Sequence, residues 1–131
     1  MTLSPIARWA AAFAATAVIL IAIGHRTLAT AEPNDVARGN YLVMDAGKCS
    51  DCHGEKLTGQ PNFINGPPGV PWATKIPQLA GLQMFKNDAD AVKFLMTGVL
   101  PDGKTALGPM PQYRFNEADA TAIVAYLRSL K

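Results

Sequence analysis

Both cysteines of the 131-residue sequence lie in one short motif, C-x-x-C-H at residues 49–53. Its chemically active side chains are Cys49, Cys52 and His53. Offsets of three and four residues fall on one face of a helical turn, so these side chains can face a single flat ligand. Two thiols at this spacing can form thioethers with the vinyl groups of one porphyrin, and the imidazole can coordinate its iron. The motif is therefore typical of the attachment site of a c-type haem.

Three other interpretations of the motif are weaker. A thioredoxin-like redox pair needs a βαβ setting, which the sequence does not show. A structural zinc site needs about four ligands, whereas residues 32–131 contain three cysteine and histidine side chains, two of them adjacent. A disulfide between Cys49 and Cys52 would close too short a loop to add much stability. Covalently bound haem c, with iron, is thus the predicted cofactor.

Residues 1–31 are predicted to be a signal peptide. Arg8 precedes an apolar run at residues 9–24, and an A-x-A cleavage site follows at residues 29–31, which is the order of a secretory signal. The run is short for a membrane span of about 20 residues. Arg26 lies between the run and the cleavage site, which leaves an uncleaved N-terminal membrane anchor as the alternative. In both cases the rest of the chain is expected to be periplasmic, either secreted across the inner membrane or facing the periplasm on a membrane tether.

Residues 32–131 are predicted to form one monohaem domain. Without Arg8 and Arg26, ten basic residues balance ten acidic ones, and this balance argues against nucleic-acid binding, which usually needs a basic surplus. A chain of about 100 residues builds only a small core, to which a buried macrocycle would add much apolar surface. The haem-free polypeptide is therefore expected to be mostly unfolded.

A few helices are predicted, separated by long loops rich in proline and glycine. Asn34 or Asp35, Asn87-Asp88 and Asn116 are capping residues that mark helix starts. The helices are expected over residues 36–44, 89–97 and 116–130, with a shorter one within residues 77–86.

Gly39 lies inside the first of these helices. A glycine there costs about 1 kcal/mol relative to alanine, which is reasonable if another helix crosses closely. The last helix has an amphipathic stripe that includes Ile123, Tyr126 and Leu127. We therefore expect the N- and C-terminal helices to cross at Gly39, with Tyr126 or Leu127 over the glycine.

The segment at residues 57–77 contains glycine and proline throughout and is predicted to be a loop, here named the Gly/Pro loop. It is expected to pack around the cofactor. One of its carbonyls should accept the Nδ1 proton of His53 and orient the ring, and Pro67 and Pro68 are the candidates. Trp72 either donates its indole N–H to a haem propionate or is part of the core.

Met110 is the candidate for the second axial ligand of the iron, opposite His53. It is flanked by Pro109 and Pro111, so it cannot lie in a helix interior or a central strand. The stiff backbone suits a thioether that must stay at a fixed distance from a metal. Three other methionines fall on predicted helices and are assigned to packing: Met44, Met84 and Met96.

With both ligands assigned, the chain resembles the class I (mitochondrial-type) cytochrome c family. Within that family it is similar to small bacterial haem c domains that accept electrons from periplasmic dehydrogenases. The matching segments are residues 38–43, 49–53, 97–99, 109–111 and 119–130. The resemblance covers nearly all of residues 35–131 and implies an all-α fold around one haem, with His53 proximal and Met110 distal. Residues 60–75 match no pattern of the family.

The predicted function is one-electron transfer between periplasmic redox partners, such as a dehydrogenase, an oxidase or another cytochrome, and not catalysis. An iron with His53 and Met110 on its two axial positions has no open site for a substrate. Methionine ligation and burial both raise the reduction potential. Lys48, Lys56 and Lys104 either guide an acidic partner to the haem edge or are scattered solubilising charges.

The sequence is also compatible with two other functions. If Met110 is not on the iron, the protein could be a five-coordinate gas sensor or a weak peroxidase. Alternatively, it could be a haem-relay subunit of a dehydrogenase complex. The charge-transfer band that a sulfur ligand gives to ferric haem separates the first alternative from the electron carrier.

Overall fold

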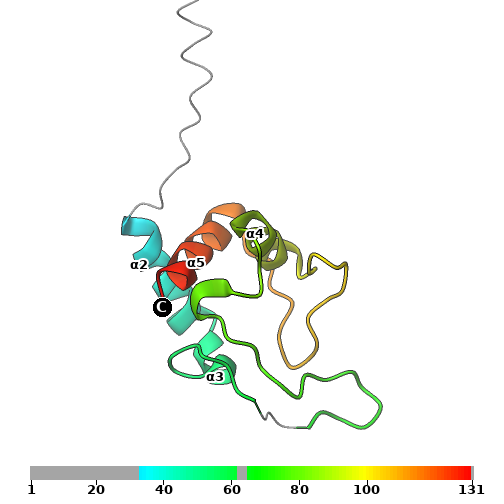
Figure 1. Ribbon diagram of the computed structural model, residues 1–131. Coiled ribbons are helices and arrows are strands. Elements are labelled where there is room, and N and C mark those ends of the chain that lie inside the picture. The colour runs from blue at the N-terminus through cyan, green and yellow to red at the C-terminus, as the bar shows by residue number, and fades with distance from the viewer. Residues whose placement is uncertain (1–32, 62–64, 131) are drawn as a thin grey trace, which may run out of the picture. The chain divides into compact units, whose positions relative to one another are not determined.

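The computed structural model describes residues 33–61 and 65–130. The predicted signal peptide or anchor at residues 1–31 lies outside the described residues. The main elements are α2 (Pro33–Tyr41), α3 (Cys49–His53), α4 (Asp88–Thr97) and α5 (Glu117–Ser129), with a π-helical turn η1 (Leu42–Ala46) and a 3₁₀ turn η2 (Ala80–Leu82) (Figure 1). The described part of the chain contains isolated β-bridges but no strand, which confirms the predicted all-α class.

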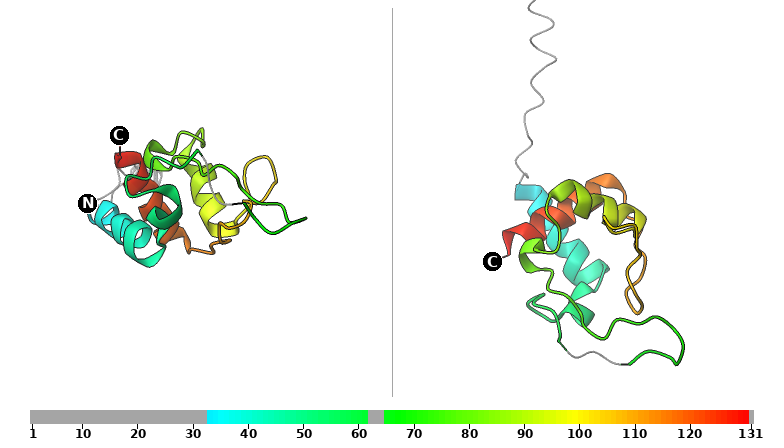
Figure 2. Two further views of the ribbon diagram at one scale, coloured as in Figure 1. Left: turned by 90° about the horizontal axis from the view of Figure 1, so that it is seen from below. Right: turned by 45° about the vertical axis from the view of Figure 1, so that its right-hand side comes forward.

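Helices α2 and α5 lie side by side in both Figure 1 and Figure 2. They cross at Gly39, where an added Cβ would collide with the carbonyl of Ala122 and would lie 2.7 Å from the Cβ of Tyr126. The expected crossing is therefore confirmed, with Tyr126 rather than Leu127 over the glycine. Ala122 brings its backbone into the contact, which the apolar stripe did not indicate.

The first helix begins and ends earlier than the predicted residues 36–44, because it starts at Pro33 and changes into η1 after Tyr41. The N–H of Gly47 donates to the carbonyl of Leu42 at 2.8 Å and ends the π-turn. A side chain at residue 47 would place its Cβ 2.7 Å from that carbonyl, so the turn requires a glycine. Lys48 then adopts a left-handed conformation (φ 51°) and turns the chain into α3.

The caps of the two later helices agree with the prediction. The side chain of Asn87 accepts the N–H of Asp90 at 2.8 Å, and that of Asn116 accepts the N–H of Asp119 at 2.9 Å. Gly98 ends α4 in the left-handed region (φ 71°), as a glycine after a helix commonly does.

The helix expected within residues 77–86 is wrong, because only the 3₁₀ turn η2 forms there. Gly81 (φ 75°) and Leu82 (φ 48°) have left-handed backbones, which a continuous helix cannot contain. The turn places Leu79, Leu82 and Phe85 in the core, where Phe85 packs against Phe94 at a ring distance of 5.6 Å.

The described part of the Gly/Pro loop has no helix. Its two ends are paired, because Gln60 and Ile76 exchange backbone hydrogen bonds of 2.9 and 2.8 Å. This pairing brings the end of the loop back beside α3, where Gly59 donates to the carbonyl of His53 at 2.9 Å. Among the described residues, no helix combines the length and the apolar character needed to span a bilayer.

Candidate haem site

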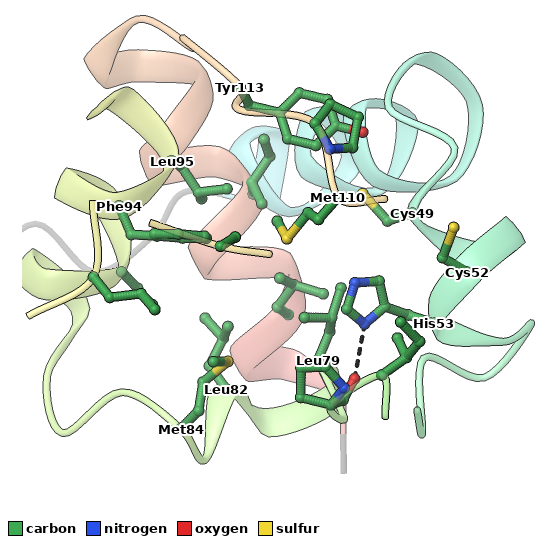
Figure 3. Close-up of a pocket in the computed structure, with 18 of the residues that line it drawn as sticks. Cys49, Cys52, His53, Leu79, Leu82, Met84, Phe94, Leu95, Met110 and Tyr113 are labelled. Carbon is green, nitrogen blue, oxygen red and sulfur yellow. Dashed lines mark hydrogen bonds between the residues drawn. The ribbon is translucent and has the colours of Figure 1, made fainter. Parts of the chain in front are cut away.

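Helix α3 presents the motif to one side of a cavity of about 240 Å³. Cys49, Cys52 and His53 all border this cavity (Figure 3). The two thiols are half-buried and form no disulfide, and His53 is 6% exposed. The single turn of helix therefore brings the three side chains to one space, as the motif predicts.

The ring of His53 is oriented by a backbone carbonyl. Its Nδ1 lies 2.7 Å from the carbonyl oxygen of Pro77 (Figure 3), and a proton on Nδ1 leaves Nε2 free to bind a metal. Burial lowers the pKa of His53, although the bond to Pro77 opposes this effect. The neutral imidazole that a metal requires is thus favoured by its surroundings.

The candidates for this acceptor, Pro67 and Pro68, were wrong. Pro77 directly follows Ile76, which pairs with Gln60 at the closed end of the Gly/Pro loop. That pairing, rather than the middle of the loop, determines which carbonyl reaches α3. A carbonyl of the Gly/Pro loop does accept the Nδ1 proton of His53, as predicted. Which residue provides that carbonyl depends on a long-range backbone pairing that cannot be read from the sequence.

Met110 borders the same cavity and lies above His53 in the view of Figure 3. It is half-buried and lies in an irregular segment, residues 107–115, here named the Met110 loop. Met84 also borders the cavity, but it is 47% exposed and lies in a turn rather than on the predicted helix. Of the other two methionines, Met44 lies on η1 and Met96 on α4, and neither borders the cavity.

The remaining walls of the cavity are mostly apolar side chains from α4, α5 and the turn around η2. They include Leu79, Leu82, Phe94, Leu95, Ile123 and Leu127. Two thiols, an imidazole with a free Nε2 and a thioether thus meet at one apolar space. This donor set fits a covalently attached haem, because it offers thioether formation, two axial ligands and a wall for the macrocycle.

Trp72 does not border the cavity. Its ring is held between the backbones of Gly66 and Gly108, where a Cβ on either glycine would collide with the indole. A hydrogen bond of 2.7 Å from the N–H of Ala73 to the carbonyl of Gly108 strengthens the same contact. Trp72 therefore joins the Gly/Pro loop to the Met110 loop, while its buried Nε1 has no partner among the described residues.

The three lysines named from the sequence differ in position. Lys48 borders the cavity, whereas Lys56 and Lys104 do not. Lys104 pairs with Asp102 at 2.9 Å, and this contact raises the pKa of Lys104 and lowers the pKa of Asp102. The three lysines therefore do not form one ring around the cavity.

Tyr113, which no sequence pattern marks, borders the cavity above Met110 (Figure 3). Its hydroxyl donates to the carbonyl of Gly47 at 2.7 Å, across 66 positions of sequence. Its ring stacks on Phe115 with a centroid distance of 5.1 Å. Burial and the nearby cysteine thiols raise the pKa of Tyr113, so the hydroxyl remains a donor at neutral pH.

An all-α domain with the C-x-x-C-H motif on the wall of an apolar cavity defines the class of c-type haem proteins. The family model described as cytochrome c matches residues 36–131, and this chain belongs to the cytochrome c family. Members of the family bind haem c covalently, and the family implies haem-based electron transfer rather than catalysis.

A curated relative is similar over most of the domain. The chain is 30% identical over 100 residues to a protein of Cereibacter sphaeroides named "Diheme cytochrome c-type". The alignment covers 70% of this chain and 34% of the relative, so this chain spans about a third of the length of the protein that it matches.

Proposed function

We propose that this protein is a one-electron carrier that holds a single haem c on Cys49 and Cys52, with His53 and Met110 as the axial ligands. The observation that carries the proposal is that all four side chains border one apolar cavity. When bound, the haem would supply an iron that alternates between Fe(II) and Fe(III).

The residues of the chain would bind, orient and shield this group. The carbonyl of Pro77, 2.7 Å from Nδ1 of His53, fixes the direction of the ring. Pro109 and Pro111 stiffen the backbone of Met110. With a ligand on each axial position there is no open coordination site for a substrate, so we propose a carrier and not an enzyme.

We further propose that residues 32–131 are a monohaem domain exported to the periplasm by residues 1–31, which act as a signal peptide or a membrane anchor. The support is the apolar run and the single C-x-x-C-H motif. Its partners would be redox proteins such as a dehydrogenase, an oxidase or another cytochrome.

N-terminal sequencing of the purified protein tests the role of residues 1–31. A mature chain that starts at Glu32 supports cleavage, and a start at Met1 or Thr2 supports an anchor. Recovery from the cytoplasm would contradict export.

The test of the ligand set compares the two methionines that border the cavity. Visible spectra of the oxidised and reduced protein are recorded for the wild type, Met110→Leu and the matched control Met84→Leu. We expect the sulfur-to-iron band in the wild type and in Met84→Leu, and its loss in Met110→Leu. The last variant should also become high-spin and bind carbon monoxide in the reduced state.

A wild type that is high-spin and binds carbon monoxide readily would contradict the carrier. That result would instead favour a five-coordinate gas sensor or a weak peroxidase. Loss of the sulfur band in Met84→Leu but not in Met110→Leu would keep the electron carrier and change its ligand. Copurification in a fixed stoichiometry with a dehydrogenase would favour the relay subunit.

A further inference from the structure

The C-x-x-C-H motif and Met110, which border one cavity, belong to segments far apart in the sequence. The motif lies on α3, directly after Gly47 and Lys48, whereas Met110 lies in the Met110 loop. Inside that loop the backbone bonds are local, from Met110 to Leu107 (3.3 Å) and from Tyr113 to Pro111 (3.1 Å). They shape the loop but do not connect it to the motif.

Two backbone bonds connect the Met110 loop to other parts of the domain. Ala73 donates to Gly108 at 2.7 Å, and Phe115 donates to Leu95 on α4 at 3.2 Å. Neither reaches the segment of residues 42–53. Among the hydrogen bonds of the described residues, the one that joins the Met110 loop to that segment runs from the hydroxyl of Tyr113 to the carbonyl of Gly47, at 2.7 Å.

The position of the acceptor makes this bond relevant to the site. Gly47 ends η1 two residues before Cys49, and a Cβ on Gly47 would lie 3.4 Å from Sγ of Cys49. Tyr113 lies three residues after Met110 in the chain. Its phenol therefore attaches the Met110 loop to the backbone beside the thiol of Cys49. The stacked Phe115 ring fixes the direction in which the phenol points.

We propose that Tyr113 is a positioning residue that keeps Met110 on the haem iron by tying the Met110 loop to Gly47. This inference rests on the proposed function, because it assumes that Met110 is an axial ligand. Without the hydroxyl, the half-buried carbonyl of Gly47 loses its partner and the loop can lift away from the cavity. Losing a neutral hydrogen bond of this kind should raise the population of the open form about five- to tenfold.

The experiment measures that population with an added ligand. Imidazole binds ferric haem only when Met110 has left, so its apparent affinity follows the fraction of open protein. The holoprotein is titrated with imidazole as wild type, Tyr113→Phe, Tyr41→Phe and Val124→Ala. Tyr41 is 58% exposed, so the variant Tyr41→Phe is the control for the loss of a remote tyrosine hydroxyl. Val124 is buried in α5 and does not border the cavity. The variant Val124→Ala is therefore the control for a general loss of folding stability.

We expect Tyr113→Phe to bind imidazole about five- to tenfold more tightly than the wild type, with a weaker sulfur-to-iron band. Tyr41→Phe and Val124→Ala should match the wild type. If Tyr113→Phe binds imidazole as the wild type does, or if Val124→Ala shows the same increase, the positioning role is wrong and the ligand set stands. If the wild type lacks the sulfur band, the proposed function fails and this inference fails with it.

Discussion

Gly39 shows how a single missing side chain determines the packing of two helices. The backbone of Ala122 lies where a Cβ on residue 39 would be, and Tyr126 closes the same space. The helix accepts a glycine that costs about 1 kcal/mol relative to alanine, because the close approach of α2 and α5 is possible only without that side chain.

We expect Gly39→Leu to lower the free energy of unfolding of the holoprotein by about 3 kcal/mol or more, because a side chain forced into a packed contact must move backbone. For a domain of this size that loss lowers the melting temperature by about 12 °C or more. The adjacent exposed residue gives the control, since Asn40→Ala should stay within about 0.5 kcal/mol. An unchanged melting temperature for Gly39→Leu would mean that the helices do not cross there.

At the site, the sequence predicts the residues whose roles depend on local chemistry. Cys49, Cys52 and His53 are close because of their spacing, and the two prolines beside Met110 mark it as a rigid loop residue. The structure brings these four side chains to one cavity. Their role as haem ligands stays a prediction that the spectra of the methionine variants test.

Pro77 and Tyr113 could not be predicted in the same way. The carbonyl of Pro77 reaches His53 because Gln60 pairs with Ile76. The hydroxyl of Tyr113 reaches Gly47 because two distant loops meet. Both contacts use a backbone carbonyl, which every residue has, so no residue type marks the acceptor in the sequence.

Among the secondary-structure elements, those with side-chain caps were predicted best. Asn87 and Asn116 bond the N–H groups three residues later, and this signal is entirely local. By contrast, the turn around η2 depends on tertiary contacts. The expected helix within residues 77–86 is interrupted by the left-handed backbones of Gly81 and Leu82. Three carbonyls of this turn also accept hydrogen bonds from α5.

Arg128, near the end of α5, provides those bonds. Its guanidinium donates to the carbonyls of Gly81 (2.7 Å), Leu82 (3.2 Å) and Phe85 (3.1 Å). It also forms an ion pair with Asp88 at 2.8 Å. One side chain thus holds the turn around η2, which lines the cavity, against the C-terminal helix.

We expect Arg128→Met to lower the free energy of unfolding of the holoprotein by about 2–3 kcal/mol, because carbonyls bonded to a charged donor lose their partners. Urea denaturation followed by circular dichroism measures the change, with the slope unaltered. Asp88→Asn removes the ion pair and keeps the bonds from Arg128 to the carbonyls. Because the Asp88 side chain is 64% exposed, this variant should lower the free energy of unfolding by about 0.5 kcal/mol or less. Equal losses in the two variants would assign the stabilisation to the ion pair instead of the carbonyls.

For the whole molecule, the cavity determines how much stability the polypeptide has without a cofactor. It measures about 240 Å³, and at about 24 cal/mol per Å³ of void this corresponds to about 6 kcal/mol. Native domains are stabilised by only about 5–15 kcal/mol in total. The cavity therefore represents a large share of the stability that a domain of about 100 residues can have.

From this estimate we expect the haem-free domain to be mostly unfolded. The double variant Cys49→Ala/Cys52→Ala cannot form thioethers, so it should lose most of its helical circular dichroism and give a poorly dispersed NMR spectrum. Met110→Leu is the matched control, because it keeps both thiols and should still unfold cooperatively with its haem attached. A well-dispersed spectrum and a cooperative transition in the haem-free double variant would show that the side chains close the cavity alone. The haem would then not be part of the core that stabilises the fold.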